Sequence, residues 1–73
     1  MDNQDLHKHL AVLELKPGAS LEEIKASYRE LVHIWHPDRF HGNPNLQQRT
    51  HLKLQQVNES YEVLKDYCEH NGH

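Results

Sequence analysis

The side chains best suited to chemistry lie close together in the middle of the sequence. His36, Pro37 and Asp38 are consecutive, and they supply an imidazole, a restricted backbone and a carboxylate. A carboxylate can form a charge-assisted, bidentate hydrogen bond with an arginine of a partner. Proline restricts the backbone and so lowers the entropy lost on docking, and histidine donates or accepts through its ring nitrogens. We therefore predict that these residues act as one docking tip.

A basic stripe leads to this tip. Lys25, Arg29 and His33 are spaced by four residues, which places them on one side of a helix. Lys25 and Arg29 are positively charged at neutral pH, and Arg39 adds a positive charge beside Asp38. The stripe is predicted to attract an acidic surface of a partner.

Other reactive residue types form no recognisable site in the sequence. The chain has eight histidines and one cysteine, Cys68. Three of the histidine pairs in the sequence are His7 with His9, His36 with His41, and His70 with His73. None of these pairs completes a metal-ligand set, and Cys68 is predicted to be a packing thiol. We expect no metal site, no cofactor and no enzymatic activity.

Three helices are predicted to carry these residues. Leucines with helical spacing predict a helix over about 4–14 that is stopped by Lys16-Pro17-Gly18. These leucines are Leu6, Leu10 and Leu13. A capping-box pattern from Ser20 to Glu23 predicts a second helix over about 21–35, which ends at the His36-Pro37 step.

The third predicted helix is the longest, over about 46–68, because neither Gly nor Pro interrupts residues 46–70. Its predicted buried stripe consists of Thr50, Leu54, Val57, Tyr61, Leu64 and Cys68. We expect residues 36–45 to form an exposed loop and the polar residues 69–73 to fray.

The predicted fold is all-α, in a single domain spanning residues 1–73. A short helix followed by two long ones favours an antiparallel hairpin of the second and third helices, crossed by the first. The loop then lies at the tip of the hairpin. Tyr28, Tyr61 and Trp35 are predicted core residues, whereas Phe40 either packs on the hairpin or contacts a partner.

Length and composition limit the possible functions. A chain of 73 residues with 36% hydrophobic residues holds one small core and no large enzyme cleft. A formal charge of -3 disfavours general nucleic-acid binding, and no stretch approaches the roughly 18 apolar residues of a membrane span. With one cysteine and no targeting pattern, we expect a cytoplasmic monomer without nucleic-acid or membrane partners.

Taken together, the motifs resemble the J domain of the DnaJ/Hsp40 co-chaperone family. The His36-Pro37-Asp38 tripeptide follows an amphipathic helix, and the flanking segments 13–20, 23–31 and 57–64 also resemble the family. The resemblance covers residues 6–67.

This resemblance implies a module that docks on an Hsp70 in its ATP-bound state and stimulates its ATP hydrolysis, coupling hydrolysis to client binding. The nucleotide and the catalytic groups then belong to the partner. The implied partner-binding residues are Lys25, Arg29, His33, His36, Pro37, Asp38 and Arg39. The helix is less basic than is usual in the family, because Ala26, Glu30 and Ile34 stand where Lys or Arg is frequent.

Three alternatives stay open on the sequence. One is a J-like interaction scaffold that binds a partner without stimulating an ATPase. A second is a co-chaperone specialised for iron–sulfur assembly, a branch of the family that Phe40 after Asp38-Arg39 resembles. A third, of a different class, is a histidine-based metal-sensing domain.

Overall fold

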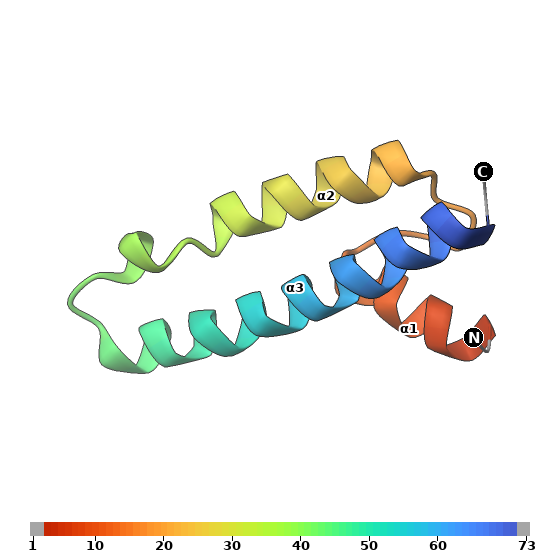
Figure 1. The fold of residues 1–73 in the computed structure, drawn as a ribbon. Coiled ribbons are helices and arrows are strands. Elements are labelled where there is room, and N and C mark those ends of the chain that lie inside the picture. The colour runs from red at the N-terminus through yellow and green to blue at the C-terminus, as the bar shows by residue number, and fades with distance from the viewer. Residues whose placement is uncertain (1–2, 72–73) are drawn as a thin grey trace.

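The computed structural model describes residues 3–71, which form three α-helices and one short 3-10 helix. The elements are α1 (Asn3–Val12), α2 (Leu21–Ile34), η1 (Pro37–Phe40) and α3 (Pro44–Asn71). α2 and α3 form an antiparallel hairpin with η1 at its tip, and α1 lies against α3 at the opposite end (Figure 1). The predicted all-α fold and its arrangement of helices are confirmed.

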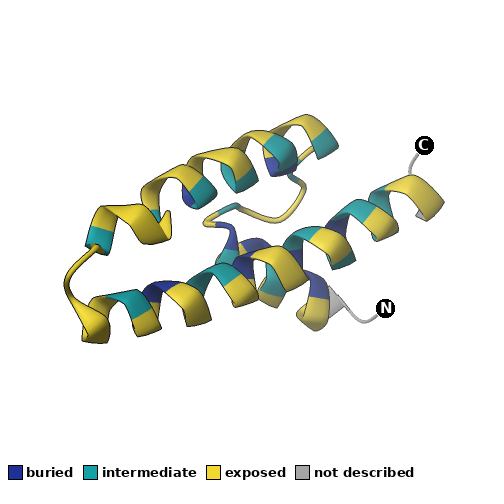
Figure 2. Cartoon of the chain, turned by 60° about the vertical axis from the view of Figure 1, so that its left-hand side comes forward, coloured by how far each residue is buried: buried dark blue, intermediate teal, exposed yellow. Residues whose placement is uncertain are grey.

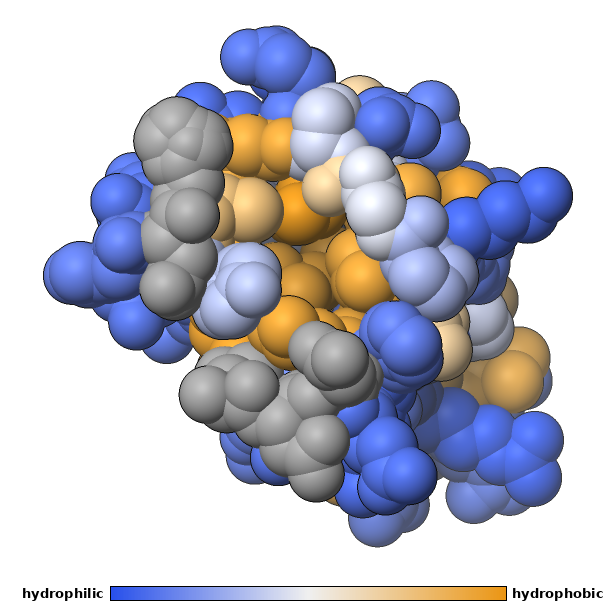
Figure 3. Space-filling view, turned by 90° about the vertical axis from the view of Figure 1, so that its right-hand side faces the viewer, coloured by the Kyte–Doolittle hydropathy of each residue, from blue (hydrophilic) through white to orange (hydrophobic). Residues whose placement is uncertain are grey.

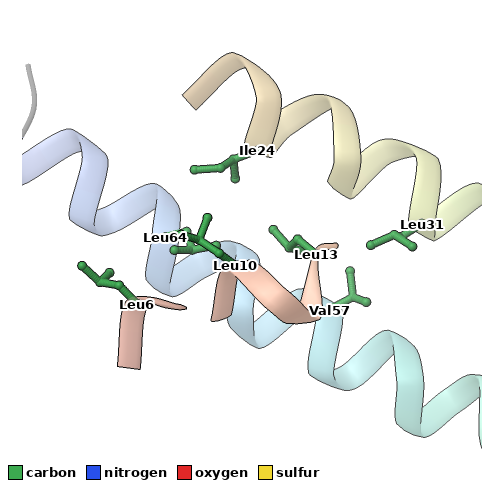
Figure 4. Packing of buried hydrophobic residues seen from close by; sticks show 7 residues of the cluster. All are labelled: Leu6, Leu10, Leu13, Ile24, Leu31, Val57 and Leu64. Atoms are coloured by element: carbon green, nitrogen blue, oxygen red, sulfur yellow. The ribbon is translucent and has the colours of Figure 1, made fainter. Parts of the chain in front are cut away.

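The hydrophobic core lies at the end of the hairpin that α1 covers. All three helical segments contribute buried side chains to it (Figure 4). The buried hydrophobic residues are Leu6, Leu10, Leu13, Ile24, Leu31, Val57 and Leu64. The predicted leucine stripe of the first helix is therefore correct. Fully buried residues lie on the inner faces, whereas the outer faces of the helices and most of the tip are exposed (Figure 2).

The turn after α1 depends on Glu14, whose φ is 61°. The Leu15 amide donates to the Leu10 carbonyl at 2.8 Å, and the Glu14 amide donates to the Ala11 carbonyl at 2.9 Å. These two bonds form a Schellman motif, which ends a helix by satisfying its last carbonyls. The prediction that Lys16-Pro17-Gly18 stops the first helix is therefore wrong, because α1 has already ended ahead of the proline.

α2 begins with the predicted capping box. The Ser20 hydroxyl accepts from the Glu23 amide at 3.1 Å, and the Glu23 carboxylate accepts from the Ser20 amide at 3.0 Å. The hydrogen bonds from the Ser20 backbone and side chain lower the pKa of Glu23 below its ordinary value of 4.5. The contribution of this carboxylate to stability is thus present above pH 4.5 and is lost as the pH falls through the lowered pKa.

α3 begins earlier than predicted, and the predicted loop is shorter. The Asn43 side chain accepts from the Leu46 amide at 3.2 Å, and Pro44 occupies the first helical position. Asparagine before a helix and proline at its first position both favour a start at this point. Part of the predicted loop over residues 36–45 is instead the 3-10 helix η1.

α3 also continues further than predicted. It extends to Asn71, so residues 69–71 are helical rather than frayed, while residues 72–73 lie outside the described range. The His70 ring donates to the Asp66 carbonyl at 2.9 Å and lies 3.0 Å from the Asp66 carboxylate. The hydrogen bond to the Asp66 backbone, followed by the Asp66 charge, raises the pKa of His70. A cationic residue in the last turn also interacts favourably with the helix dipole.

The buried face of α3 is wider than the predicted stripe. Thr50 and Val57 are buried as predicted, but Leu54 is only half-buried. Ser60, which the predicted stripe does not include, is buried, and its hydroxyl lies 2.9 Å from Nδ1 of His9. The difference arises because α1 covers a second side of α3, and a single helical stripe describes contact with only one neighbour.

The predicted core aromatics lie at the rim of the core. The Tyr28 and Tyr61 rings stack with their centroids 4.0 Å apart, and the Tyr28 hydroxyl donates to Asn58 Oδ1 at 2.7 Å. Trp35 is half-buried and packs against the core at the end of α2. These side chains extend the packing between α2 and α3 toward the tip.

We expect Leu13→Ala to unfold a large part of the population. Leu13 is fully buried, and loss of such a leucine costs about 2–5 kcal/mol, compared with a total stability on the order of 4–11 kcal/mol for a chain of this length. Leu52→Ala is the matched control, because the Leu52 side chain is 55% exposed. Thermal melts followed by circular dichroism measure both variants, and equal melting temperatures would show that the core is wrongly placed.

We expect Glu14→Gly to raise the melting temperature. A left-handed conformation costs a residue with a Cβ about 1 kcal/mol, and glycine adopts it freely. Glu14 is exposed, so few contacts are lost. Gly18→Ala is the control with the opposite expected effect. Gly18 has a φ of 90°, a conformation that is strained for alanine, so this variant should have a lower melting temperature than wild type. A Glu14→Gly variant that is no more stable than wild type would contradict the Schellman geometry.

Candidate functional site

The tip of the hairpin is an ordered, hydrogen-bonded turn. His36 precedes η1 in an extended conformation, and its Nδ1 accepts from the Asp38 amide at 3.3 Å. The Arg39 amide donates to the His36 carbonyl at 3.0 Å, and the His41 amide donates to the Asp38 carbonyl at 3.4 Å. Pro37 begins η1 at a position where a helix needs no amide donor. Each residue of the tripeptide thus has a distinct role in shaping the turn.

The Asp38 carboxylate points away from the protein. Its side chain is 93% exposed, and its Oδ2 lies 3.7 Å from Nδ1 of His36. That distance is longer than a hydrogen bond. Since the backbone of Asp38 is held by the turn while its carboxylate has no hydrogen bond within residues 3–71, the group is available for a partner.

The basic stripe lies on α2 as predicted. Arg29 and His33 are exposed, and Lys25 is half-buried. Lys25 lies about 14 Å along the helix axis from the last residue of α2, so the stripe and Asp38 form an extended surface rather than one pocket. Arg39 is exposed within η1. The structure therefore joins the predicted residues in a row along one helix and its tip.

The charges of the chain are unevenly distributed along the hairpin. The segment 25–58 carries five basic and two acidic residues, whereas the rest of the sequence carries three basic and nine acidic residues. This segment comprises most of α2, the tip and the first half of α3. The basic surface near the tip is thus larger than the stripe of α2 suggests, because Arg49 and Lys53 on α3 add to it. The sequence feature that could have predicted this larger basic surface is the absence of acidic residues between Asp38 and Glu59.

Phe40 packs back onto the hairpin, which decides a question that the sequence left open. It is half-buried, and its ring centroid lies 6.3 Å from that of Trp35, with 33° between the ring planes. Nζ of Lys53 lies 5.9 Å from the centroid of the Trp35 ring. These contacts connect η1, the end of α2, and α3.

The single cysteine lies away from the tip. Cys68 is half-buried and packs against the core, in agreement with the predicted packing thiol. Within residues 3–71, no three side chains of His, Cys, Asp or Glu come together as a group able to hold a metal ion. None of the helices described is both long and apolar enough to cross a membrane.

An apolar hollow lies at the end of the molecule opposite the tip. Hydrophobic side chains gather at its centre and hydrophilic ones surround it (Figure 3). The hollow has a volume of about 250 Å³ and is lined by residues of α1, of the turn before α2, of α2 and of α3, among them Leu6, Leu10, Ile24, Leu64 and Cys68. None of the predicted partner-binding residues lines it.

Comparison with known proteins identifies the family. A family model for the DnaJ domain matches residues 8–70. DnaJ homolog subfamily B member 8 of Mus musculus is 46% identical over 55 residues, which cover 75% of this chain and 23% of that protein. The chaperone protein DnaJ of Dichelobacter nodosus (strain VCS1703A) is 39% identical over 66 residues, which cover 90% of this chain and 16% of that protein.

A third relative is DnaJ homolog subfamily C member 11 of Bos taurus, which is 38% identical over 66 residues, covering 90% of this chain and 11% of that protein. The chain therefore spans less than a quarter of the length of these relatives. No solved structure matches the chain. The family match includes the second half of α1, all of α2 and η1, and α3 as far as residue 70, and the chain belongs to the DnaJ domain family.

Proposed function

We propose that this domain is a co-chaperone module that docks on an Hsp70 in its ATP-bound state and stimulates ATP hydrolysis. The observation that carries the proposal is the Asp38 carboxylate, which is 93% exposed on an ordered turn at the end of a basic helix face. Membership of the DnaJ domain family supports the same reading. The proposed partner-binding residues are Lys25, Arg29, His33, His36, Pro37, Asp38 and Arg39.

In this proposal the domain contributes binding energy and no catalytic group. A domain that binds the hydrolysis-competent conformation of Hsp70 more tightly than the resting one shifts the population toward it. The Asp38 carboxylate is suited to an arginine of the partner, since charge-assisted bidentate bonds are strong and directional. ATP and the groups that hydrolyse it belong to the Hsp70.

The basic segment of the domain, residues 25–58, is complementary in charge to an acidic docking surface, which we propose for the partner. Five basic residues within 25–58 speed association with such a surface by electrostatic steering. Because the Debye length is about 8 Å at physiological salt, steering acts only at short range and weakens as salt is added. We further propose that the domain acts as a monomer in the cytoplasm, which its single cysteine supports.

We expect Asp38→Asn to abolish stimulation of Hsp70 while the melting temperature stays within about 2–4 °C of wild type, because surface substitutions change stability by about 0.5 kcal/mol or less. The change removes the charge but keeps the size of an exposed side chain. The measurement is the ATP hydrolysis rate of purified bacterial, cytosolic eukaryotic and mitochondrial Hsp70 at several concentrations of the domain.

Asp66→Asn is the matched control for this variant. Asp66 is also exposed, with 73% of its side chain accessible, but it lies near the end of α3 that is remote from the tip. Stimulation should be retained in this control. If a folded Asp38→Asn protein stimulates as well as wild type, Asp38 is not the docking group. If wild type binds an Hsp70 without stimulating it, the scaffold alternative is correct.

We expect Arg29→Ala to slow association with Hsp70 about fivefold, equivalent to about 1 kcal/mol, at low salt. Surface plasmon resonance at low and high salt gives the association rate. Arg49→Ala is the control, because it removes the same charge from α3 and should have a smaller effect. Ala26→Lys should speed association. Rates that depend neither on salt nor on these substitutions would exclude α2 as the docking face.

A further inference from the structure

We propose that Phe40, Trp35 and Lys53 form a positioning cluster, the tip clasp, which fixes the orientation in which Asp38 is presented. This inference rests on the proposed docking function and assigns three further residues to it. None of the three needs to contact the partner. They act through the backbone of η1.

Asp38 needs such a device because its side chain is anchored by nothing beyond the turn. The two hydrogen bonds that involve the backbone of Asp38 itself are long, at 3.3 Å for the Asp38 amide and 3.4 Å for the His41 amide that donates to the Asp38 carbonyl. η1 has only four residues, and a 3-10 helix of this length has poor hydrogen-bond geometry and little stability of its own. The direction of the carboxylate is therefore set by whatever holds η1 to the hairpin.

Phe40 is the residue of η1 that reaches the hairpin. It is the last residue of η1 and is half-buried, while Pro37, Asp38 and Arg39 are exposed. Its centroid distance of 6.3 Å from Trp35 lies within the range of aromatic pairs that attract one another. Trp35 in turn is fixed at the end of α2, where its amide donates to the Leu31 carbonyl at 2.9 Å and its ring packs against the core.

Lys53 completes the clasp from the other helix. Its ammonium lies 5.9 Å from the centroid of the Trp35 ring, within the distance of a cation–π interaction. Lys53 forms no ion pair with any residue of the described chain, so the ring is its defined electrostatic partner. The clasp thereby joins η1, which carries Asp38, to the helix that precedes it in the sequence, α2, and to the helix that follows it, α3.

Loosening the clasp should weaken docking without changing what the docked complex does. A mobile turn samples more orientations, and only a fraction of them can bind, so the apparent affinity falls by that fraction. The bound geometry is unchanged. The half-maximal concentration for stimulation should therefore rise while the maximal stimulation is retained, in contrast to the loss expected for Asp38→Asn.

The first experiment needs no partner. NMR water-exchange rates are measured for the His41 and Asn43 amides, which donate to the Asp38 and Phe40 carbonyls. Phe40→Ala should accelerate exchange about two- to tenfold, the range that corresponds to the strength of an aromatic pair. Phe40→Tyr keeps a ring and should restore slow exchange. Leu52→Ala, an exposed apolar truncation on α3, should leave both amides unchanged.

The second experiment measures the concentration dependence of stimulation with the Hsp70 panel. Phe40→Ala should raise the half-maximal concentration about two- to tenfold at unchanged maximal rate, and Phe40→Tyr should restore it. Lys53→Met keeps the aliphatic stem and removes the charge, so a rise of about two- to fivefold is expected, measured at high salt, where the steering effect of this charge is screened. Lys53→Arg retains a cation over the ring and should behave as wild type.

The two experiments separate the clasp from the proposed function. Exchange rates in Phe40→Ala equal to those of wild type would overturn the clasp, whatever the Hsp70 assay gives. Faster exchange with an unchanged half-maximal concentration would also overturn it, because the clasp would then not position Asp38 for docking. Failure of wild type to stimulate any Hsp70 would overturn the proposed function, while the exchange rates would still decide whether Phe40 holds the turn.

Discussion

The structure depends on one constraint: a chain of 73 residues can build a single small core, and α1 must be present to close it. Leucines from the α1 segment pack against side chains of both long helices (Figure 4). Leu13, fully buried, follows the last turn of α1, so the Schellman motif at Glu14 also determines where this side chain enters the core. The helices of the hairpin are held at this end, and their direction determines where the tip lies.

The tip is consequently remote from the core and is stabilised by different interactions. The molecule extends 43 Å in its longest dimension but only 21 and 18 Å in the others. Toward the tip, leucine packing gives way to the stacked Tyr28 and Tyr61 rings and then to Trp35 with Phe40. Aromatic rings with polar edges suit this half-exposed region, because they supply contact area without requiring full burial. The projecting turn holds the backbone of Asp38 while it leaves the carboxylate exposed.

Net charge describes this molecule poorly. The formal charge of -3 combines a basic segment over residues 25–58 with acidic flanking segments. With a Debye length of about 8 Å, a partner at one end of a molecule 43 Å long responds to the charges near that end. In the proposed docking, the acidic residues elsewhere would therefore weaken association little. The distribution of charge along the hairpin would then matter more for the proposed function than its sum.

The amino-acid sequence by itself determined the elements and the chemistry of the tip. Apolar spacing predicted the leucine stripe of α1, the capping box predicted the start of α2, and the tripeptide His36-Pro37-Asp38 identified the candidate site. These signals are local, because caps, proline steps and helical periodicity depend on residues a few positions apart.

Contacts between distant segments were decided only by the tertiary structure. Ser60 is buried because His9, 51 residues earlier, lies against it. The spacing of apolar residues along α3 cannot predict a contact with a residue of α1. Glu14 takes a left-handed conformation although its residue type disfavours it, since the chain must turn there to bring Leu13 into the core. Phe40 was ambiguous for the same reason: whether an aromatic residue after a turn packs inward or faces a partner depends on what the fold places beside it. The fold places Trp35 there, because α2 ends at that point and packing against α3 fixes its direction.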